Sequence, residues 1–522
     1  MTMAYAGYFV NRYRGLWTEN DTALFSGIAG QTVQAGTVLF SGQYTHGFGY
    51  PGFLAALALA TGLAPAVMNT VVLPYVGALL LVLVALLLYR RLLRSQRASA
   101  LAAGLLLLAP DVMFAVLRGN HEKLNVALLL TSFYALFEGF GSARRHRTGD
   151  LAVWAMLFYL CTIVNACVND YFASTFVLAA ALAMAILGAI AALVGRRARW
   201  GEGAVGRLAL VCATSWLLVW WVMLYVFPPA GADFRLLGTA MQKLAHLFLS
   251  LQARSNPFAA PARQWAGRTA QAAVAAFRYL LVLGSFVVWL WEAVWLLRRR
   301  GRRGPSLERA FLLGVYAGFA VLVAVAVPLD FTGLAAGTNL EVRNFTYFAL
   351  VAAPVFALGI LRLAALARRP RHRRRAAGWR LAAGAGRQVV VVACVGLLGI
   401  SLLKVTLDPA VSNFWMFYSP DERQALTAFS SHARASTLWT GPDDRLANVQ
   451  ETWGGANPFD NNVVGYSIAS QPQIRNLLIS PIVAANAVAD SFPLPYLGGM
   501  NQIYDNGGAR ILHFAPETSF ES

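Results

Sequence analysis

Long apolar runs separated by short polar gaps make up most of the chain before residue 405. Ten of these runs are long enough to cross a membrane as helices, since a helix needs about 20 apolar residues to span a hydrocarbon core of roughly 30 Å. They lie at 66–89, 100–117, 124–140, 151–168, 172–195, 207–227, 275–297, 309–328, 344–366 and 388–405. The pattern predicts an all-α, polytopic membrane domain.

Clusters of arginine indicate which gaps share a side of the membrane. The clusters fall in every second gap and begin at Arg90, Arg144, Arg196, Arg298 and Arg368. Such an excess of arginine is typical of cytoplasmic loops. The other gaps are therefore expected outside, together with everything after residue 405: 118–123, 169–171, 228–274 and 329–343.

The region 12–65 is also expected outside, because the span that follows it ends at the Arg90 cluster,. A span should then precede this region, but Met1–Val10 supplies only about half of the ~20 residues required,. Either the first helix is short or the start of the sequence omits part of it, and we favour the second explanation. We expect about eleven spans in the inner (plasma) membrane, with the N-terminus in the cytoplasm.

The composition supports a membrane protein and excludes several other classes. Hydrophobic residues make up 58% of the chain and charged residues 13%, against about 25% charged in ordinary globular chains. The net charge of +19 is concentrated in the loops, so we expect no nucleic-acid partner,. All four cysteines lie inside apolar runs, which argues against a disulfide framework or metal-ligand spacing,. No phosphate-binding loop or dinucleotide fingerprint occurs.

Two outer segments and the tail have patterns of their own. Residues 51–63 and 233–252 are expected to form helices that lie in the membrane interface,. The tail 406–522 holds 11 acidic against 5 basic residues. Its patterns predict a helix from Ser419, a strand at Ser436–Thr440 and a closing hairpin around Asn506-Gly507,. We therefore divide the chain into a transmembrane domain, 1–405, and a small extracytoplasmic α/β domain, 406–522.

Two candidate sites lie in the outer region 12–65. Glu19 and Asp21 could supply a general base or a metal ligand,. The alternative is that Asn20 or Asp21 only caps an interfacial helix that runs to about Gln34. Tyr44 and His46 belong to a loop rich in glycine and aromatic residues. His46 could contact a phosphate or transfer a proton, although a histidine of this kind more often just bonds within its loop.

Three further candidates follow along the chain. The gap 118–123 packs Arg118, His121, Glu122 and Lys123 into one short turn; beside hydrocarbon this density favours function over a solvated charged turn,. Arg343, at the mouth of a span, could grip a phosphate or serve as an interface anchor,. Two further outer candidates are Asp170 and Tyr347.

Taken together, these segments resemble the GT-C class of membrane glycosyltransferases, which includes protein O-mannosyltransferases and the lipid A aminoarabinose transferase. In that class an acidic pair follows the first span, as Glu19-Asn20-Asp21 does, although the class more often has adjacent acids. An aromatic segment with a proline, like Gly49–Leu54, then opens an interfacial helix. A late span begins with Arg and Tyr and contains Pro, as Arg343, Tyr347 and Pro354 do here.

The resemblance implies transfer of a sugar from a polyprenyl-phosphate donor to a glycan, lipid or protein acceptor outside the cell, with inversion. Asp21 would be the base, and Arg343 with Arg118 or Lys123 would neutralise the leaving phosphate. Glu19, His46 and Glu122 would orient sugar hydroxyls or hold a divalent ion such as Mg2+ or Mn2+. Membrane lipids would surround the donor tail.

Two other functions fit the same sequence. A transporter or flippase for a lipid-linked or anionic solute would also be polytopic, but such proteins usually carry repeats and charges at mid-depth. A non-catalytic scaffold or sensor would use the tail 406–522 to bind partners.

Overall fold

The computed structural model describes most of the membrane domain and the core of a small C-terminal unit. The described residues are 2–13, 20–38, 44, 46–194, 202–231, 268–298, 307–331, 340–367, 395–396, 398–399, 420–432, 438–440, 457–458, 476–479 and 501–513.

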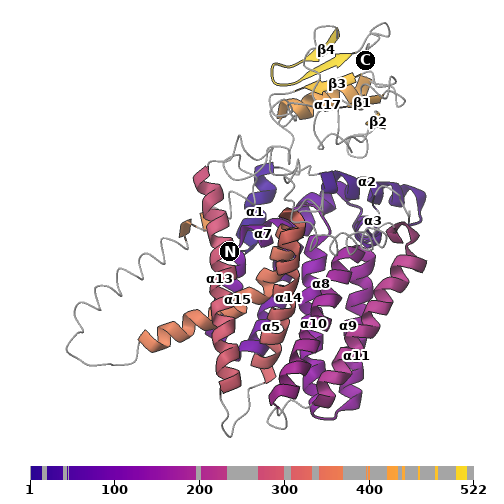
Figure 1. Cartoon of the computed structure of the whole chain (residues 1–522). Helices are drawn as coiled ribbons and strands as arrows, with labels where there is room; N and C mark the ends of the chain where they lie inside the picture. Colours follow the sequence, from indigo (N-terminus) through magenta and orange to yellow (C-terminus); the bar gives the residue numbers. More distant parts are fainter. Residues whose placement is uncertain are drawn as a thin grey trace, which may run out of the picture.

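Helices form the membrane part of the chain (Figure 1). They are α1 (Thr2–Tyr13), α2 (Asn20–Ala35), α3 (Gly49–Thr61), α4 (Pro65–Val67), the π-helical turn η1 (Met68–Val72), α5 (Leu73–Leu93), α6 (Gln96–Leu107), α7 (Pro110–Leu117), α8 (Glu122–Arg144), α9 (Thr148–Val168), α10 (Asp170–Val194), α11 (Glu202–Trp221), η3 (Val222–Val226), η4 (Pro228–Ala230), α13 (Arg268–Arg298), α14 (Leu307–Phe331) and α15 (Leu340–Ala367).

Eight helices in the described part of the chain are long and apolar enough to cross a membrane. A ninth crossing is counted if α6 and α7 form one span, although they are bent by 76° at a break near Pro110,. The predicted count of eleven spans includes two more segments. One is α1, whose 12 residues extend about 18 Å,. The other is 388–405, most of which lies outside the described residues. The chain is a multi-pass membrane protein of the predicted fold class.

Small residues let the spans pack closely where lipid offers no hydrophobic driving force. Gly314 and Gly318 lie four residues apart on α14 and face α10. A Cβ on Gly318 would lie 2.3 Å from the Ala179 carbonyl oxygen, and one on Gly314 would lie 2.6 Å from Leu187. The contact between α10 and α14 therefore depends on glycine.

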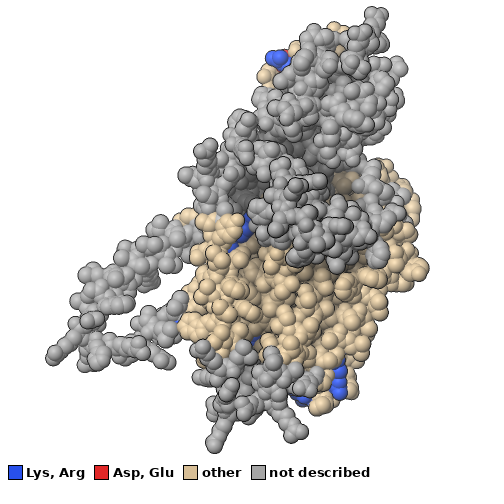
Figure 2. Space-filling view, in the orientation of Figure 1, with Lys and Arg blue, Asp and Glu red and all other residues tan. Residues whose placement is uncertain are grey.

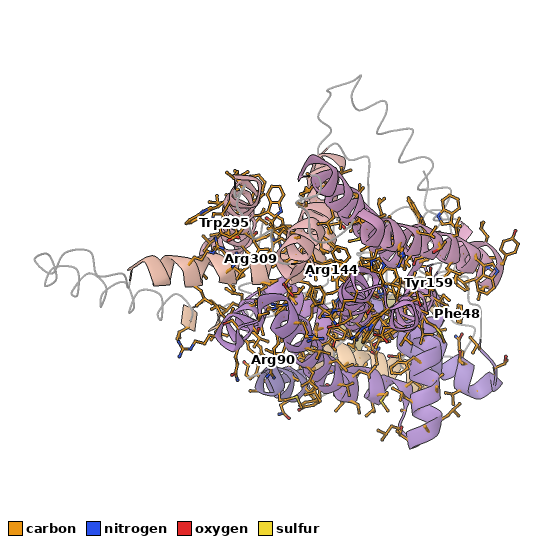
Figure 3. The ribbon with its side chains drawn as sticks, turned by 90° about the horizontal axis from the view of Figure 1, so that it is seen from below. Phe48, Arg90, Arg144, Tyr159, Trp295 and Arg309 are labelled. Carbon is orange, nitrogen blue, oxygen red and sulfur yellow. The ribbon has the colours of Figure 1, made fainter. Side chains whose placement is uncertain are left out.

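Arginines collect at one end of the bundle. Arg91 Nε lies 2.6 Å from Glu138 Oε1, which joins the ends of α5 and α8, and Arg94 pairs with Glu308 at the start of α14. On the face that Figure 2 shows, the bundle has an almost uncharged band, with basic side chains at its lower end and one small basic patch near its upper edge. Figure 3 views the bundle from that end and labels Arg90, Arg144 and Arg309 on three helices. Of the five predicted clusters, two have side chains that the structure describes, those at Arg90 and Arg144, and both lie at the same end of the bundle.

The opposite end carries α2 and α3, which run across the top of the bundle (Figure 1). The predicted short helix at 51–63 is present as α3, and the predicted helix after Asn20 is present as α2. Phe25 of α2 and Tyr50 of α3 are fully buried and pack edge to face, with ring centres 5.1 Å apart. The predicted helix at 233–252 lies outside the described residues.

The tail forms a small α/β unit (Figure 1). Helix α17 (Pro420–His432) accompanies a sheet in the order β2-β1-β3-β5-β4. The strands are β1 (Leu438–Thr440), β2 (Asn457–Pro458), β3 (Asn476–Ile479), β4 (Asn501–Asp505) and β5 (Arg510–His513). The predicted hairpin is confirmed: β4 pairs antiparallel with β5, and Gly507 has φ +85° in the turn, a conformation that glycine adopts without strain.

Candidate functional site

The turn between α7 and α8, residues 118–123, lies at the centre of a buried polar cluster. His121 is 4% exposed, Glu122 7% and Lys123 2%. The alternative of a solvated charged turn is therefore wrong. Buried charges are costly unless they are paired, so the partners of these side chains show how the turn is held.

Each charged side chain of the turn has a close partner. Arg118 Nη2 lies 2.7 Å from Glu122 Oε1, so these two residues, four positions apart, form an ion pair. Lys123 Nζ donates to the Arg118 carbonyl at 2.6 Å and to the Tyr50 hydroxyl at 3.2 Å. These bonds fix the turn against α3 and leave the Arg118–Glu122 pair as its most exposed charges, at 12% and 10% of their side chains.

Asn69 joins three segments at this end, and the sequence interpretation missed it. Its Oδ1 accepts a hydrogen bond from the Tyr50 hydroxyl at 2.6 Å. Its Nδ2 lies 2.9 Å from the Gly119 carbonyl, 3.2 Å from Ser26 Oγ and 3.3 Å from the Thr22 carbonyl. Asn69 sits in the π-helical turn η1, and such turns are common at functional sites,. The available signal was a single asparagine at the start of an apolar span.

A second chain of hydrogen bonds runs through His121. The Asn169 side-chain nitrogen donates to the Tyr44 hydroxyl at 2.8 Å and lies 3.4 Å from His121 Nε2. Since Asn169 Oδ1 accepts from the Phe172 amide, its nitrogen faces the histidine. His121 Nε2 then accepts, and Nδ1 carries the proton that it donates to Asn125 Oδ1 at 2.7 Å,. The histidine is thus oriented from both sides.

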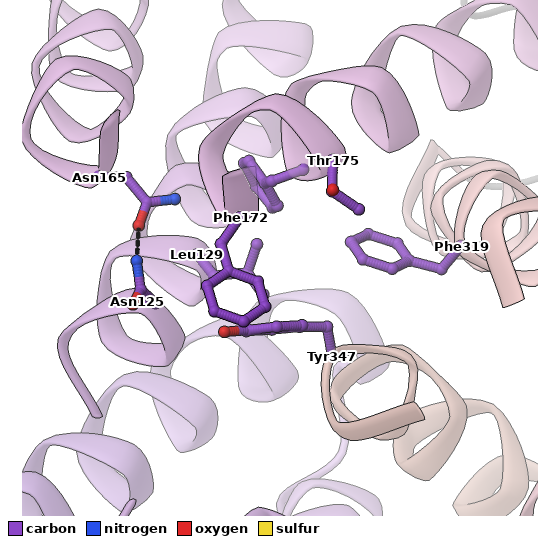
Figure 4. Close-up of a pocket in the computed structure, with 8 residues that line it drawn as sticks. Asn125, Leu129, Asn165, Phe172, Thr175, Phe319 and Tyr347 are labelled. Atoms are coloured by element: carbon purple, nitrogen blue, oxygen red, sulfur yellow. Dashed lines mark hydrogen bonds between the residues drawn. The ribbon is translucent and has the colours of Figure 1, made fainter. Parts of the chain in front are cut away.

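The series of hydrogen bonds through His121 continues inward to a small cavity (Figure 4). Asn125 donates to Asn165, and both line the cavity with Tyr347 of α15 and Phe172 of α10. The rings of Phe172 and Tyr347 are 5.0 Å apart. The volume of about 10 Å³ is at the lower limit for one water molecule,. The polar cluster therefore reaches from the end of the bundle toward the first turns of α15.

The structure brings eight of the predicted site residues to this end of the bundle. His46 is placed by its backbone, because its carbonyl accepts from the Asp170 amide at 2.9 Å, and its ring lies 5.2 Å from the Tyr44 ring. Asp170 is 1% exposed and opens α10. The eight residues are Tyr44, His46, Arg118, His121, Glu122, Lys123, Asp170 and Tyr347.

The remaining three predicted residues are placed less fully. Glu19 lies outside the described residues. Asp21 is in the first turn of α2, next to Thr22, which packs on Gly119 of the central turn. Arg343 is in the first turn of α15, one turn before Tyr347. The backbones of Asp21 and Arg343 therefore both reach this end of the bundle, while their side chains lie outside what the structure describes.

A further ion pair at this end was also missed. Arg278 of α13 lies 3.0 Å from Asp111 of α7, and the Asp111 side chain is 4% exposed. The guanidinium of Arg278 is 5.1 Å from the centre of the Phe345 ring, two residues after Arg343. Neither residue stood out in the sequence: Asp111 is a single charge inside the 100–117 run, and Arg278 is a single charge near the start of the 275–297 run.

The described residues do not fit a metal centre. No group of three or more His, Cys, Asp or Glu side chains in the described part of the chain could hold an ion. The Glu122 carboxylate is already paired with Arg118.

Comparison with known proteins identifies the fold. No family model and no curated protein matches the chain. Among solved structures, the oligosaccharyltransferase of Archaeoglobus fulgidus, crystallised with zinc and sulfate, matches 98% of this chain and 72% of its own, with 12% identity and a TM-score of 0.53.

ArnT of Cupriavidus metallidurans also matches, at 13% identity in both of its structures. Its apo form has a TM-score of 0.46 over 98% of this chain and 96% of ArnT. Its form bound to undecaprenyl phosphate has a TM-score of 0.44 over 98% and 97%. With the spans and the C-terminal sheet, the match to the oligosaccharyltransferase shows that the chain has a GT-C-like fold, which is the fold class that its sequence motifs predict.

Proposed function

We propose that the chain is a membrane glycosyltransferase that moves a sugar from a polyprenyl-phosphate donor to a hydroxyl-bearing acceptor, with inversion, on the extracytoplasmic side. The observation that carries this proposal is the buried polar cluster around residues 118–123, at the end of the bundle opposite the arginines. The one-sided arginines support an outer position for the cluster, because arginine-rich loops face the cytoplasm.

In the proposed reaction the acceptor oxygen attacks the anomeric carbon of the sugar while the bond from that carbon to the phosphate oxygen breaks. The acceptor proton passes to the Asp21 carboxylate, and the leaving phosphate keeps the bonding electron pair. A carboxylate within hydrogen-bond reach is suited to take such a proton. Asp21 is a reasonable base because its helix turn lies against the 118–123 turn.

Cations near the start of α15 would stabilise the charge that grows on the phosphate. Arg343 is proposed for this role, together with Arg118. Lys123 is more suited to holding the turn, since its Nζ is buried against Tyr50 and the Arg118 carbonyl. Glu19, His46 and Glu122 would orient sugar hydroxyls, and the polyprenyl tail would lie between spans.

Reconstituted protein tests the proposal. Proteoliposomes that contain the full chain are supplied with polyprenyl-phosphate-linked hexoses and an envelope extract as acceptor. We expect Asp21→Asn and Arg343→Ala each to lower sugar transfer by roughly 10²–10⁴-fold without loss of folding. Asp150→Asn and Arg147→Ala are matched controls, because these residues form an exposed pair at the arginine end. If both site variants transfer sugar like the wild type, the mechanism is wrong.

A further inference from the structure

Two buried polar atoms beside the central turn have no hydrogen-bond partner among the described residues. They are the Thr22 hydroxyl oxygen and the Asn120 side-chain nitrogen. Thr22 is 2% exposed and Asn120 is fully buried. Buried polar groups without partners are rare, because each loses its hydrogen bonds to water and gains none in return. A ligand would supply the partners that the two groups lack.

The two groups come from different segments, whose backbones meet at Asn69. Asn69 Nδ2 lies 3.3 Å from the Thr22 carbonyl and 2.9 Å from the Gly119 carbonyl, so both backbones meet at one atom. A Cβ on Gly119 would lie 2.6 Å from the Thr22 hydroxyl oxygen. Only glycine allows the first turn of α2 to come this close to the residue that precedes Asn120.

The hydrogen bond that Asn120 already makes shows which of its side-chain groups remains for a ligand. Asn120 Oδ1 accepts from the Glu122 amide at 3.0 Å, which fixes the orientation of the side-chain amide. Its nitrogen must therefore face the other way, as a donor. The Thr22 hydroxyl can also donate. Two neutral donors at one place suit an oxygen that accepts hydrogen bonds.

The charges around the two donors favour a neutral oxygen over an anionic one. Arg118 is paired with Glu122 at 2.7 Å, and Lys123 donates to the Arg118 carbonyl and the Tyr50 hydroxyl. A phosphate would be bound better by the cations near the start of α15, as proposed above. A sugar hydroxyl, in contrast, needs hydrogen bonds and no countercharge.

We propose that Thr22 and Asn120 form a subsite that binds a hydroxyl oxygen of the transferred sugar, directly beside Asp21. This inference rests on the proposed function and deepens it, because it assigns sugar selection to two neutral side chains. A site built to bond a substrate hydroxyl discriminates strongly against an analogue that lacks it, since its buried donors are then left unpaired.

Thr22→Val is the direct test. Valine keeps the methyl group that packs on Gly119 and replaces the hydroxyl with a second methyl group of similar size. Thr22→Ser is the matched control that keeps the hydroxyl. The full chain in nanodiscs is titrated with undecaprenyl phosphate and with undecaprenyl-phosphate-linked glucose, mannose and galactose. We expect the wild type to bind at least one hexosyl lipid more tightly than the sugar-free lipid.

Thr22→Val should weaken binding of that hexosyl lipid about tenfold, which is the effect of one lost hydrogen bond, and Asn120→Asp should weaken it as well. Thr22→Ser should bind the hexosyl lipid as tightly as the wild type does. Binding of undecaprenyl phosphate should stay unchanged in every variant. The melting temperature of unliganded Thr22→Val should equal or exceed that of the wild type, because an unpartnered polar group has been removed.

A hexosyl-lipid preference that survives in Thr22→Val would overturn the subsite and leave the proposed function standing. A lower melting temperature in the same variant would then show that the two donors hold an enclosed water. If the wild type binds neither the sugar-free lipid nor any hexosyl lipid, the proposed function itself fails and the subsite with it.

Discussion

The Tyr89 hydroxyl donates a hydrogen bond to the Leu350 carbonyl at 2.6 Å, and both residues are buried. In a regular helix the Leu350 carbonyl would accept from the backbone amide of residue 354. That residue is Pro354, which has no amide hydrogen,. A side chain from α5 thus satisfies the carbonyl that the proline leaves open in α15.

Removing this hydroxyl should destabilise the protein. Tyr89→Phe leaves the Leu350 carbonyl buried without a donor, and we expect a loss of about 1–3 kcal/mol in the free energy of unfolding. The measurement is thermal or chemical unfolding of the purified full chain in detergent. Tyr279→Phe is the control, because Tyr279 is 58% exposed on α13 and should tolerate loss of its hydroxyl.

Pro354→Ala should rescue Tyr89→Phe. Alanine supplies the missing amide hydrogen, so the Leu350 carbonyl regains a partner within its own helix. In a double-mutant cycle, Tyr89→Phe should therefore cost less in the Pro354→Ala background than in the wild type. Strictly additive effects would show that the hydroxyl does not compensate for the proline.

The sequence predicts the two spans that contain Tyr89 and Pro354, but it does not predict that these spans are in contact. Pro354 is visible inside an apolar run and Tyr89 is visible just before Arg90. Their spans follow from hydropathy, because length and apolarity decide whether a helix can cross the membrane. The hydrogen bond joins residues 261 positions apart, and nothing in the local pattern selects which spans become neighbours.

A methyl group at Gly119 should separate α2 from the central turn. The added Cβ would lie 2.5 Å from the Thr22 methyl carbon, so the first turn of α2 must shift. Because Asp21 lies in that turn, we expect Gly119→Ala to reduce sugar transfer at least tenfold, a size typical of a small misplacement of reacting groups. Transfer is measured in the proteoliposomes described above.

Gly104→Ala is the matched control for this prediction. No atom lies within 4 Å of a Cβ built on Gly104, which sits in α6. Alanine should be tolerated there, since it favours a helix over glycine. Equal activity of the Gly119 and Gly104 variants would contradict the proposed contact between α2 and the turn.

The buried pair Arg118–Glu122 should behave as a unit. Arg118→Gln or Glu122→Gln alone leaves one charge in a buried place, which typically costs about 3–5 kcal/mol. The double variant should cost less than the sum of the two single changes. The same cycle on Arg147 and Asp150, whose side chains are 63% and 54% exposed, should show a coupling below about 1 kcal/mol,. Unfolding of the four variants in detergent measures both cycles.

The candidate site was only partly visible in the sequence. The 118–123 turn stood out because four ionisable residues fall within six positions beside an apolar run. Asn69, Asn125 and Asn165 did not, since each is a single polar residue inside or at the edge of a span. Asn69 bonds the Gly119 carbonyl, whereas Asn125 bonds both His121 and Asn165. The contacts of Asn69 and Asn165 depend on packing between helices rather than on local composition.

Cysteine labelling should place the two ends of the bundle on opposite sides of the membrane. Arg147→Cys puts a thiol at the arginine end, where the native side chain is 63% exposed, and Asn501→Cys puts one on the exposed β4 of the C-terminal unit. If the arginines face the cytoplasm, a membrane-impermeant maleimide should label Asn501→Cys in intact cells and Arg147→Cys only after the cells are opened. The wild type controls for background, since the described native cysteines lie within the spans. Labelling of Arg147→Cys in intact cells would reverse the proposed orientation and move the polar cluster to the cytoplasmic side.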